Sequence, residues 1–141
     1  MIDPTVIIRD LLVTAGVGNF AATIGWGIYI HKEPEAPDSV ITIYETGGKP
    51  PNPAWLLDFP SIQVRIRGSK GDSVLARAKA SEVMDNLLGA PYQAVTGGDL
   101  GSITSIGGIN SLGWDKNNRP IFTTNFNLIL EPSEGLNRQA I

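Results

Sequence analysis

Apolar residues recur at the spacing of an α-helix in two stretches of the chain. The first stretch follows Asp3 and Pro4, and a carboxylate N-cap before a proline at the first helical position is typical of a helix start. Gly16 ends this helix, whose apolar face consists of Ile7, Ile8, Leu11 and Leu12. The second helix is expected to begin near Asp72 or Ser73 and to end at 89–91, with an apolar face of Ala76, Ala80, Val83, Met84 and Leu87.

Apolar and polar residues alternate in other stretches, which predicts β-strands with one buried face. The clearest alternation lies in residues 62–67, where Arg65 and Arg67 are both expected to point away from the core. The longest runs from Phe122 to Leu130, and shorter strands are expected at 26–30 and 40–44. Residues 95–113 are rich in glycine, which favours irregular strands with turns or bulges.

These elements predict an α+β fold in which two helices pack on one face of a mostly antiparallel, mixed sheet. The chain has 141 residues, which suits a single domain with its own core over residues 1–141, followed by a loose polar tail from about residue 131. Proline lacks the N–H that sheet pairing needs, so the proline-rich stretch between the strands at 40–44 and 62–67 is expected to form a long, stiff loop.

Composition narrows the possible function classes. The formal net charge is -3, and a general nucleic-acid binder normally carries a basic surplus. The chain contains no cysteine, which excludes disulfides, thiolate catalysis and cysteine-ligated zinc. No secretion signal precedes the first helix, and no apolar run approaches the ~18 residues of a membrane span. We therefore expect a soluble protein that is made and kept inside the cell, without a membrane partner.

Candidate catalytic residues are few. His31 is the only histidine, so a histidine-based metal cluster has no second imidazole, and we expect neither a metal nor a cofactor. The glycine pairs lack the flanking residues of a phosphate-binding loop. Two alternatives stay open: a small hydrolase that uses scattered carboxylates (Glu33, Glu35, Asp99, Asp115 and Glu131), and a nucleic-acid-binding module that uses Arg65, Arg67, Lys70 and Arg77.

Charges of opposite sign are separated along the chain. Residues 31–58 carry five carboxylates against two lysines, whereas residues 65–79 carry five basic side chains against Asp72 alone. Two complementary patches of this kind allow head-to-tail association, in which each copy contacts the next through different surfaces. We expect the acidic 31–58 surface of one copy to bind the basic 65–79 surface of another.

The order of these motifs resembles the minor capsid and tail terminator proteins of long-tailed bacteriophages. A Pro-Asp turn at Pro37 and Asp38 precedes a strand that ends in Tyr-Glu-Thr-Gly-Gly. A second strand follows and ends in Arg-x-Arg-Gly. A Leu-Gly-x-Asp hairpin, LGWDKNNRP, then closes on Arg-Pro before Asn125 and Phe126. The resemblance covers roughly Trp26 to Leu130, and the sequence departs from the family pattern at Trp114 and in the glycine-rich 97–108 region.

The resemblance implies a structural virion protein without catalysis. It implies a homo-oligomeric ring, usually a hexamer, that caps the finished tail tube and joins the tail to the head, with the tube protein and head–tail connector proteins as partners. The protein would be assembled in the host cytoplasm, reside at the head-proximal end of the tail and bind no specific nucleic acid. A head-completion or neck protein is the alternative within the same particle. The residues expected at the subunit or tube interface are Glu45, Thr46, Gly47, Gly48, Lys49, Arg65, Arg67, Trp114, Asp115 and Arg119.

Overall fold

The computed structural model describes residues 1–141 as two helices and eight strands. In chain order these elements are α1 (Pro4–Thr14), β1 (Asn19–Phe20), β2 (Gly27–Ile30), β3 (Val40–Lys49), β4 (Phe59–Arg67), α2 (Ser73–Leu87), β5 (Gln93–Val95), β6 (Gly98–Ser105), β7 (Asn110–Trp114) and β8 (Pro120–Pro132). No helix has both the length and the apolar character needed to cross a membrane.

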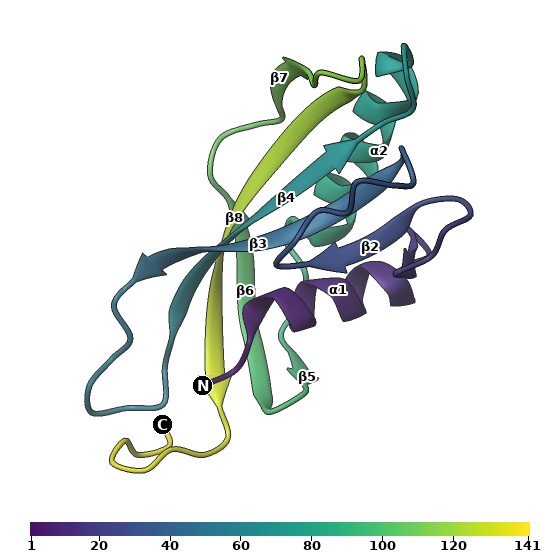
Figure 1. Cartoon of the computed structure of the whole chain (residues 1–141). Helices are drawn as coiled ribbons and strands as arrows, with labels where there is room; N and C mark the ends of the chain where they lie inside the picture. The colour runs from purple at the N-terminus through teal and green to yellow at the C-terminus, as the bar shows by residue number, and fades with distance from the viewer.

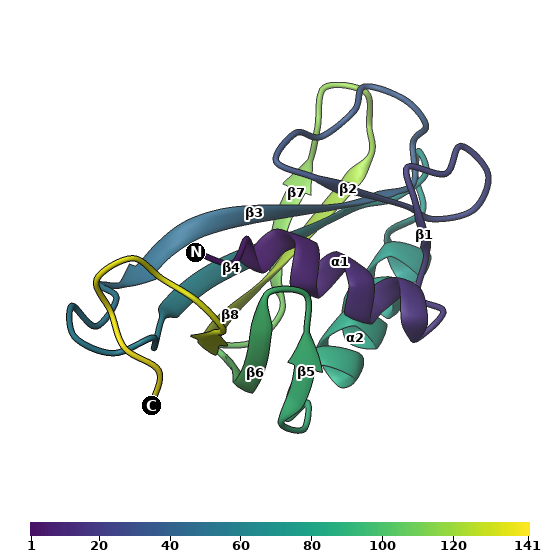
Figure 2. The same cartoon turned by 90° about the horizontal axis from the view of Figure 1, so that it is seen from below.

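All the strands belong to one twisted sheet, in the order β1-β2-β3-β4-β8-β6-β5, with β7 paired to the start of β8. The pairs β1–β2 and β2–β3 are parallel, and the remaining pairs are antiparallel. Both helices lie on the same face of this sheet, as Figure 1 and the perpendicular view in Figure 2 show. The predicted α+β fold, with a mostly antiparallel mixed sheet and two helices on one face, is confirmed.

Local sequence signals explain where the helices begin. The Asp3 carboxylate accepts a hydrogen bond from the Thr5 N–H (2.9 Å), and the Asp72 carboxylate accepts one from the Leu75 N–H (3.1 Å). Each bond satisfies an N–H group that the first helical turn leaves without a partner. Apolar side chains from both helices and from β3, β4, β6 and β8 then form the core between helices and sheet, which includes Leu12, Ile43, Val64, Ala80 and Phe126.

The β3–β4 hairpin is longer than the sequence pattern predicted. β3 continues past Tyr44 to Lys49 and pairs with β4 back to Phe59, with a bulge between Glu45 and Gly47, so the connecting loop shrinks to residues 50–58. Gly48 permits this extension, because its φ is +90° and a Cβ atom there would lie 2.3 Å from the carbonyl oxygen of Phe59. The predicted long loop is therefore partly strand.

The residues after β8, where the sequence predicts a loose polar tail, contact the β3–β4 loop. β8 extends to Pro132, and the segment beyond it returns to the β3–β4 loop. The Gln139 N–H donates to the Ala54 carbonyl, and the Leu56 N–H donates to the Gln139 carbonyl, both at 2.8 Å. In the glycine-rich region, β6 and β7 carry bulges near Gly101 and Leu112, so irregular strands are confirmed there.

Candidate assembly surfaces

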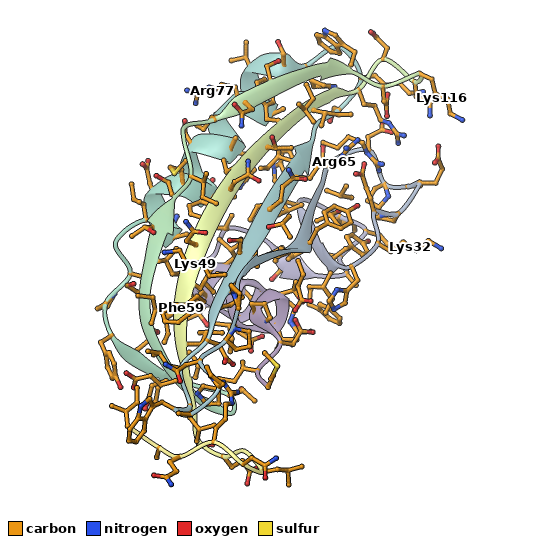
Figure 3. All side chains as sticks on the ribbon, turned by 90° about the vertical axis from the view of Figure 1, so that its left-hand side faces the viewer. Lys32, Lys49, Phe59, Arg65, Arg77 and Lys116 are labelled. Atoms are coloured by element: carbon orange, nitrogen blue, oxygen red, sulfur yellow. The ribbon has the colours of Figure 1, made fainter.

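The predicted interface residues form two groups at opposite ends of the long strands. Glu45 to Lys49 lie at the end of β3, beside the start of β4, whereas Arg67 lies at the other end of β4, close to the β7–β8 turn. The nine residues of β4 correspond to about 26 Å at ~3.3 Å per residue. Figure 3 shows this separation, with Lys49 and Phe59 in one half of the sheet and Lys116 at the far tip.

The polar β7–β8 turn is a self-contained hydrogen-bonded structure. One oxygen of the Asp115 carboxylate accepts the N–H groups of Asn117 and Arg119, both at 2.9 Å, and the other accepts the Nε–H of Arg119 at 2.8 Å. Burial would raise the pKa of Asp115, but the hydrogen bonds from Arg119 and Asn117 outweigh it and hold the pKa below its ordinary value. The Asp115 side chain is therefore a carboxylate anion, and its three hydrogen bonds hold the turn in this conformation.

Arg119 joins this turn to the loop between β2 and β3. The guanidinium is buried, with 6% of its side chain exposed, and its Nη1–H donates to the Glu35 carbonyl at 2.7 Å. The carboxylates of Asp38 and Glu35 lie 3.4 and 3.6 Å from its nitrogens. Burial would lower the pKa of Arg119, but Asp115 and these neighbouring carboxylates raise it above its ordinary value. We expected the Arg119 guanidinium at a subunit or tube interface, but in the structure it binds acceptors of its own chain.

Arg67 fixes the same loop from the sheet side. Its guanidinium is 3% exposed and donates to the carbonyls of Pro37 (2.7 Å), Asp38 (3.0 Å) and Glu35 (3.3 Å). Its Nη1–H also donates to the Glu33 carboxylate at 2.7 Å. A buried guanidinium whose hydrogen bonds go to backbone carbonyls holds a loop in one conformation. Arg67 does point away from the helix-covered core, as the alternation predicts, but the 33–38 loop buries it on the opposite face.

Arg65 completes this internal charge cluster. It is partly exposed, and its Nε lies 2.6 Å from the second oxygen of Glu33, so Glu33 bridges both arginines. Glu33 of the acidic 31–58 stretch therefore pairs with Arg65 and Arg67 of the basic 65–79 stretch within one molecule. The 33–38 loop folds over the helix-free face of the sheet, so Glu33, Arg65 and Arg67 pair within the chain, and the predicted binding of the next copy at these charges stays a prediction.

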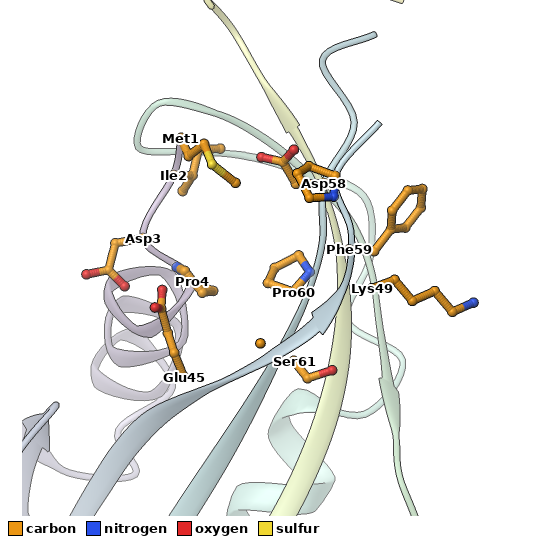
Figure 4. A pocket seen from close by; sticks show the side chains of 12 residues that line it. Met1, Ile2, Asp3, Pro4, Glu45, Lys49, Asp58, Phe59, Pro60 and Ser61 are labelled. Atoms are coloured by element: carbon orange, nitrogen blue, oxygen red, sulfur yellow. The ribbon is translucent and has the colours of Figure 1, made fainter. Parts of the chain in front are cut away.

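The end of the β3–β4 hairpin is exposed to solvent. Glu45, Thr46, Gly47, Gly48 and Lys49 are all exposed. Between this part of the hairpin and the segment before α1 lies a cavity of about 430 Å³. Figure 4 shows the carboxylates of Glu45 and Asp58 on its wall, whereas the carboxylate of Asp3, which also lines it, is turned away.

Asp58 and its partner Arg138 were missed by sequence reasoning. The side chain of Asp58 is 4% exposed, and one of its oxygens accepts a hydrogen bond from Arg138 Nη1 at 2.6 Å. The second oxygen is buried without a hydrogen-bond donor. The two residues are 80 positions apart, and no local signal connects a loop aspartate to an arginine in a polar C-terminal segment.

Trp114 is the remaining predicted interface residue. It lies on β7, which pairs with β8 through one edge only, and about half of its side-chain surface is exposed. Leu112 on the same strand is 54% exposed. An exposed apolar pair on an edge strand is typical of a contact surface.

The five carboxylates of the hydrolase alternative do not converge on one site, although Asp99 pairs in register with Glu131, and Glu35 lies with Asp115 beside Arg119. Glu33 binds Arg65 and Arg67, Asp115 binds Arg119, and Glu131 accepts a hydrogen bond from the Tyr92 hydroxyl, which raises the pKa of Tyr92 to about 12. His31 lies 3.1 Å from the Asp3 carboxylate, and no group of three His, Cys, Asp or Glu side chains is placed to hold a metal ion. Burial raises the pKa of Asp3, but the hydrogen bonds from Thr5, followed by that from His31, outweigh it and lower the pKa below its ordinary value.

Comparisons with known proteins found a matching family model and a solved structure of similar fold. The family model described as "Bacteriophage tail terminator protein" matches residues 11–132. A chain of the solved structure titled "Virion of native gene transfer agent (GTA) particle" is similar in fold, with a TM-score of 0.70 at 16% sequence identity, over 90% of this chain and 93% of that chain. No curated protein matches the chain in sequence.

Proposed function

Because the chain belongs to the bacteriophage tail terminator family and is a structural component of a phage virion, we propose that it caps the tail tube as a ring of identical copies. In this proposal the ring is a hexamer that sits at the head-proximal end of the tail and joins the tube protein to the head–tail connector proteins. The observation that carries the proposal is the family match over residues 11–132, which includes both ends of the sheet.

The shape of the subunit supports a ring. A closed ring is built from a heterologous contact, in which two different surfaces of the subunit meet. The sheet offers two such surfaces, since its hairpin end and its β7–β8 end are about 26 Å apart along β4 and are both exposed. Figure 1 shows these ends at opposite extremes of the molecule.

The proposed interface residues divide into two roles. Glu45 to Lys49 and Trp114 are exposed and are proposed to touch a neighbouring subunit or the tube. Arg67, Asp115 and Arg119 are proposed to act indirectly, because their hydrogen bonds fix the 33–38 loop and the β7–β8 turn in the conformation that is presented. Such a role requires recognition and no catalysis.

Negative-stain electron microscopy of purified tail tubes, with and without the protein, tests the proposal. We expect added protein to form a cap on one end of each tube and to stop further growth of tubes in a polymerisation mixture. Averaged end views of the caps should show sixfold symmetry. Tubes that grow to the same lengths and keep bare ends at a large molar excess of protein would contradict the proposed function.

A DNA-retention control separates assembly from the nucleic-acid alternative. Of the four basic residues proposed for that role, Arg67 is buried and Arg65 is paired, which leaves Lys70 and Arg77 exposed. We expect the protein to pass through a DNA column at low salt, because two free cations release few counterions. Retention that falls steeply with salt would favour nucleic-acid binding.

A further inference from the structure

The lining of the cavity beside the β3–β4 hairpin contains three acidic residues and one basic residue. Asp3, Glu45 and Asp58 line it, and Lys49, the basic residue among its neighbours, extends away on the other side of the strands (Figure 4). Glu45 takes part in no ion pair. Asp3 is already bound by Thr5 and His31, and Asp58 by Arg138, so Glu45 is the carboxylate of this cavity that attracts a further cation.

One carboxylate oxygen of Asp58, which lines this cavity, has no hydrogen-bond donor. Arg138 occupies only one oxygen of its carboxylate, and the other is buried without a donor. Figure 4 shows the carboxylate turned toward Met1 and Ile2 across the cavity. A buried acceptor without a donor is costly, so a donor that reaches it stabilises the structure it joins. An ammonium group supplies both the charge and the donor.

Free ammonium groups lie at the other end of the molecule. Lys70 and Lys116 are exposed and form no ion pair within the chain. A hydrogen bond of 3.0 Å from the Gly71 N–H to the Asn118 carbonyl joins the segments that carry them, and the Asp115–Arg119 contacts hold the turn rigid. We call these two lysines the basic tip.

The basic tip cannot reach the cavity of its own chain. β4 begins at the cavity with Phe59 and ends three residues before Lys70, so about 26 Å of strand separates the two sites. An extended lysine side chain is far shorter than this distance. We propose that the cavity lined by Asp3, Glu45 and Asp58 binds a lysine of the basic tip of a second copy. The contact is head-to-tail and rests on the proposed ring.

Cross-linking tests this contact directly, because the chain has no cysteine of its own. Three single-cysteine variants are made beside the contact residues: Thr46→Cys at the cavity, Ser69→Cys at the tip, and Lys32→Cys as a control at an exposed residue elsewhere. Mixtures of two variants are treated with a short bis-maleimide, both in solution and on tail tubes. We expect the Thr46→Cys and Ser69→Cys mixture to give at least tenfold more heterodimer than the Thr46→Cys and Lys32→Cys mixture.

The outcomes separate this inference from the proposed function. Equal cross-linking of the two mixtures, in solution and on capped tubes, overturns the inference and leaves tube capping intact. Preferential cross-linking with tubes that stay uncapped supports the contact and contradicts the cap. Cross-linking of Ser69→Cys to the tube protein in place of Thr46→Cys assigns the basic tip to the tube and overturns the inference.

Charge reversal gives an independent measurement. The double variant Lys70→Glu and Lys116→Glu removes the basic tip, while Lys32→Glu with Arg77→Glu makes the same charge change at exposed residues outside the tip. We expect the first double variant to weaken self-association at least tenfold in sedimentation equilibrium and the second to retain it within about twofold. Equal effects of the two double variants would mean that net charge alone governs association.

Discussion

Replacing Arg67 by methionine is the sharpest test of the internal charge cluster. Methionine fills a similar length of apolar space but removes every hydrogen bond of the guanidinium. The carbonyls of Pro37 and Asp38 then lose their donor, whereas the Glu35 carbonyl keeps its bond from Arg119. Glu33 keeps Arg65, so the carboxylate is not left alone.

The size of the effect follows from these groups. An unsatisfied buried acceptor costs roughly 1–3 kcal/mol, and removal of one partner of a buried ion pair costs roughly 3–5 kcal/mol. Detachment of the 33–38 loop would relieve part of this cost, so we expect Arg67→Met to lower the free energy of unfolding by about 3 kcal/mol. The matched variant Arg65→Met removes one partly exposed ion pair and should cost at most ~1 kcal/mol.

Urea unfolding of the two variants, followed by tryptophan fluorescence and by circular dichroism, measures the difference. With a denaturant slope of ~2 kcal/mol per M, the midpoint should fall by about 1.5 M for Arg67→Met and by no more than ~0.5 M for Arg65→Met. Equal midpoints for the two variants would show that Arg67 does not hold the loop and that its burial contributes nothing to stability.

Three further predictions concern the hairpin, the C-terminal segment and the turn. Gly48→Ala should destabilise the protein by more than Gly47→Ala in the same urea assay, because both glycines have φ near +90° but only at position 48 would a Cβ meet backbone atoms. Arg138→Ala should lower the free energy of unfolding by ~3 kcal/mol, because Asp58 is left as an unpaired buried charge, and an equally stable variant would show that Asp58 needs no partner. The pKa of Asp115 is lowered by folding, so its stabilising effect is present above its unfolded value near 3.8 and is lost as the pH falls through the lower folded value. Asp115→Asn should therefore flatten the acid limb of the unfolding profile below pH 4, and an unchanged limb would contradict the assignment.

Local sequence patterns predicted both helices and the longer strands of this fold, though not β1 or the extension of β3, because their signals act over a few residues. The carboxylates before both helices and the apolar faces that follow them depend on spacing within one helix. Alternation in residues 62–67 also placed Arg65 and Arg67 correctly on the face opposite Ile62, Val64 and Ile66. The family resemblance was carried by the order of these same short motifs.

Only the tertiary structure decided what covers each face and which charges meet. Alternation says that Arg67 leaves the helix-covered core, but it cannot say that residues 33–38 fold over the opposite face and bury it. The partners of Arg67 lie about 30 positions away, and those of Arg138 lie 80 or more. Such pairs are set by the register of the sheet and the path of the loops, which bring together residues that no periodic pattern connects. The sequence alone therefore determines most of the elements and the family, and the three-dimensional packing determines which charged residues remain free to bind a second molecule.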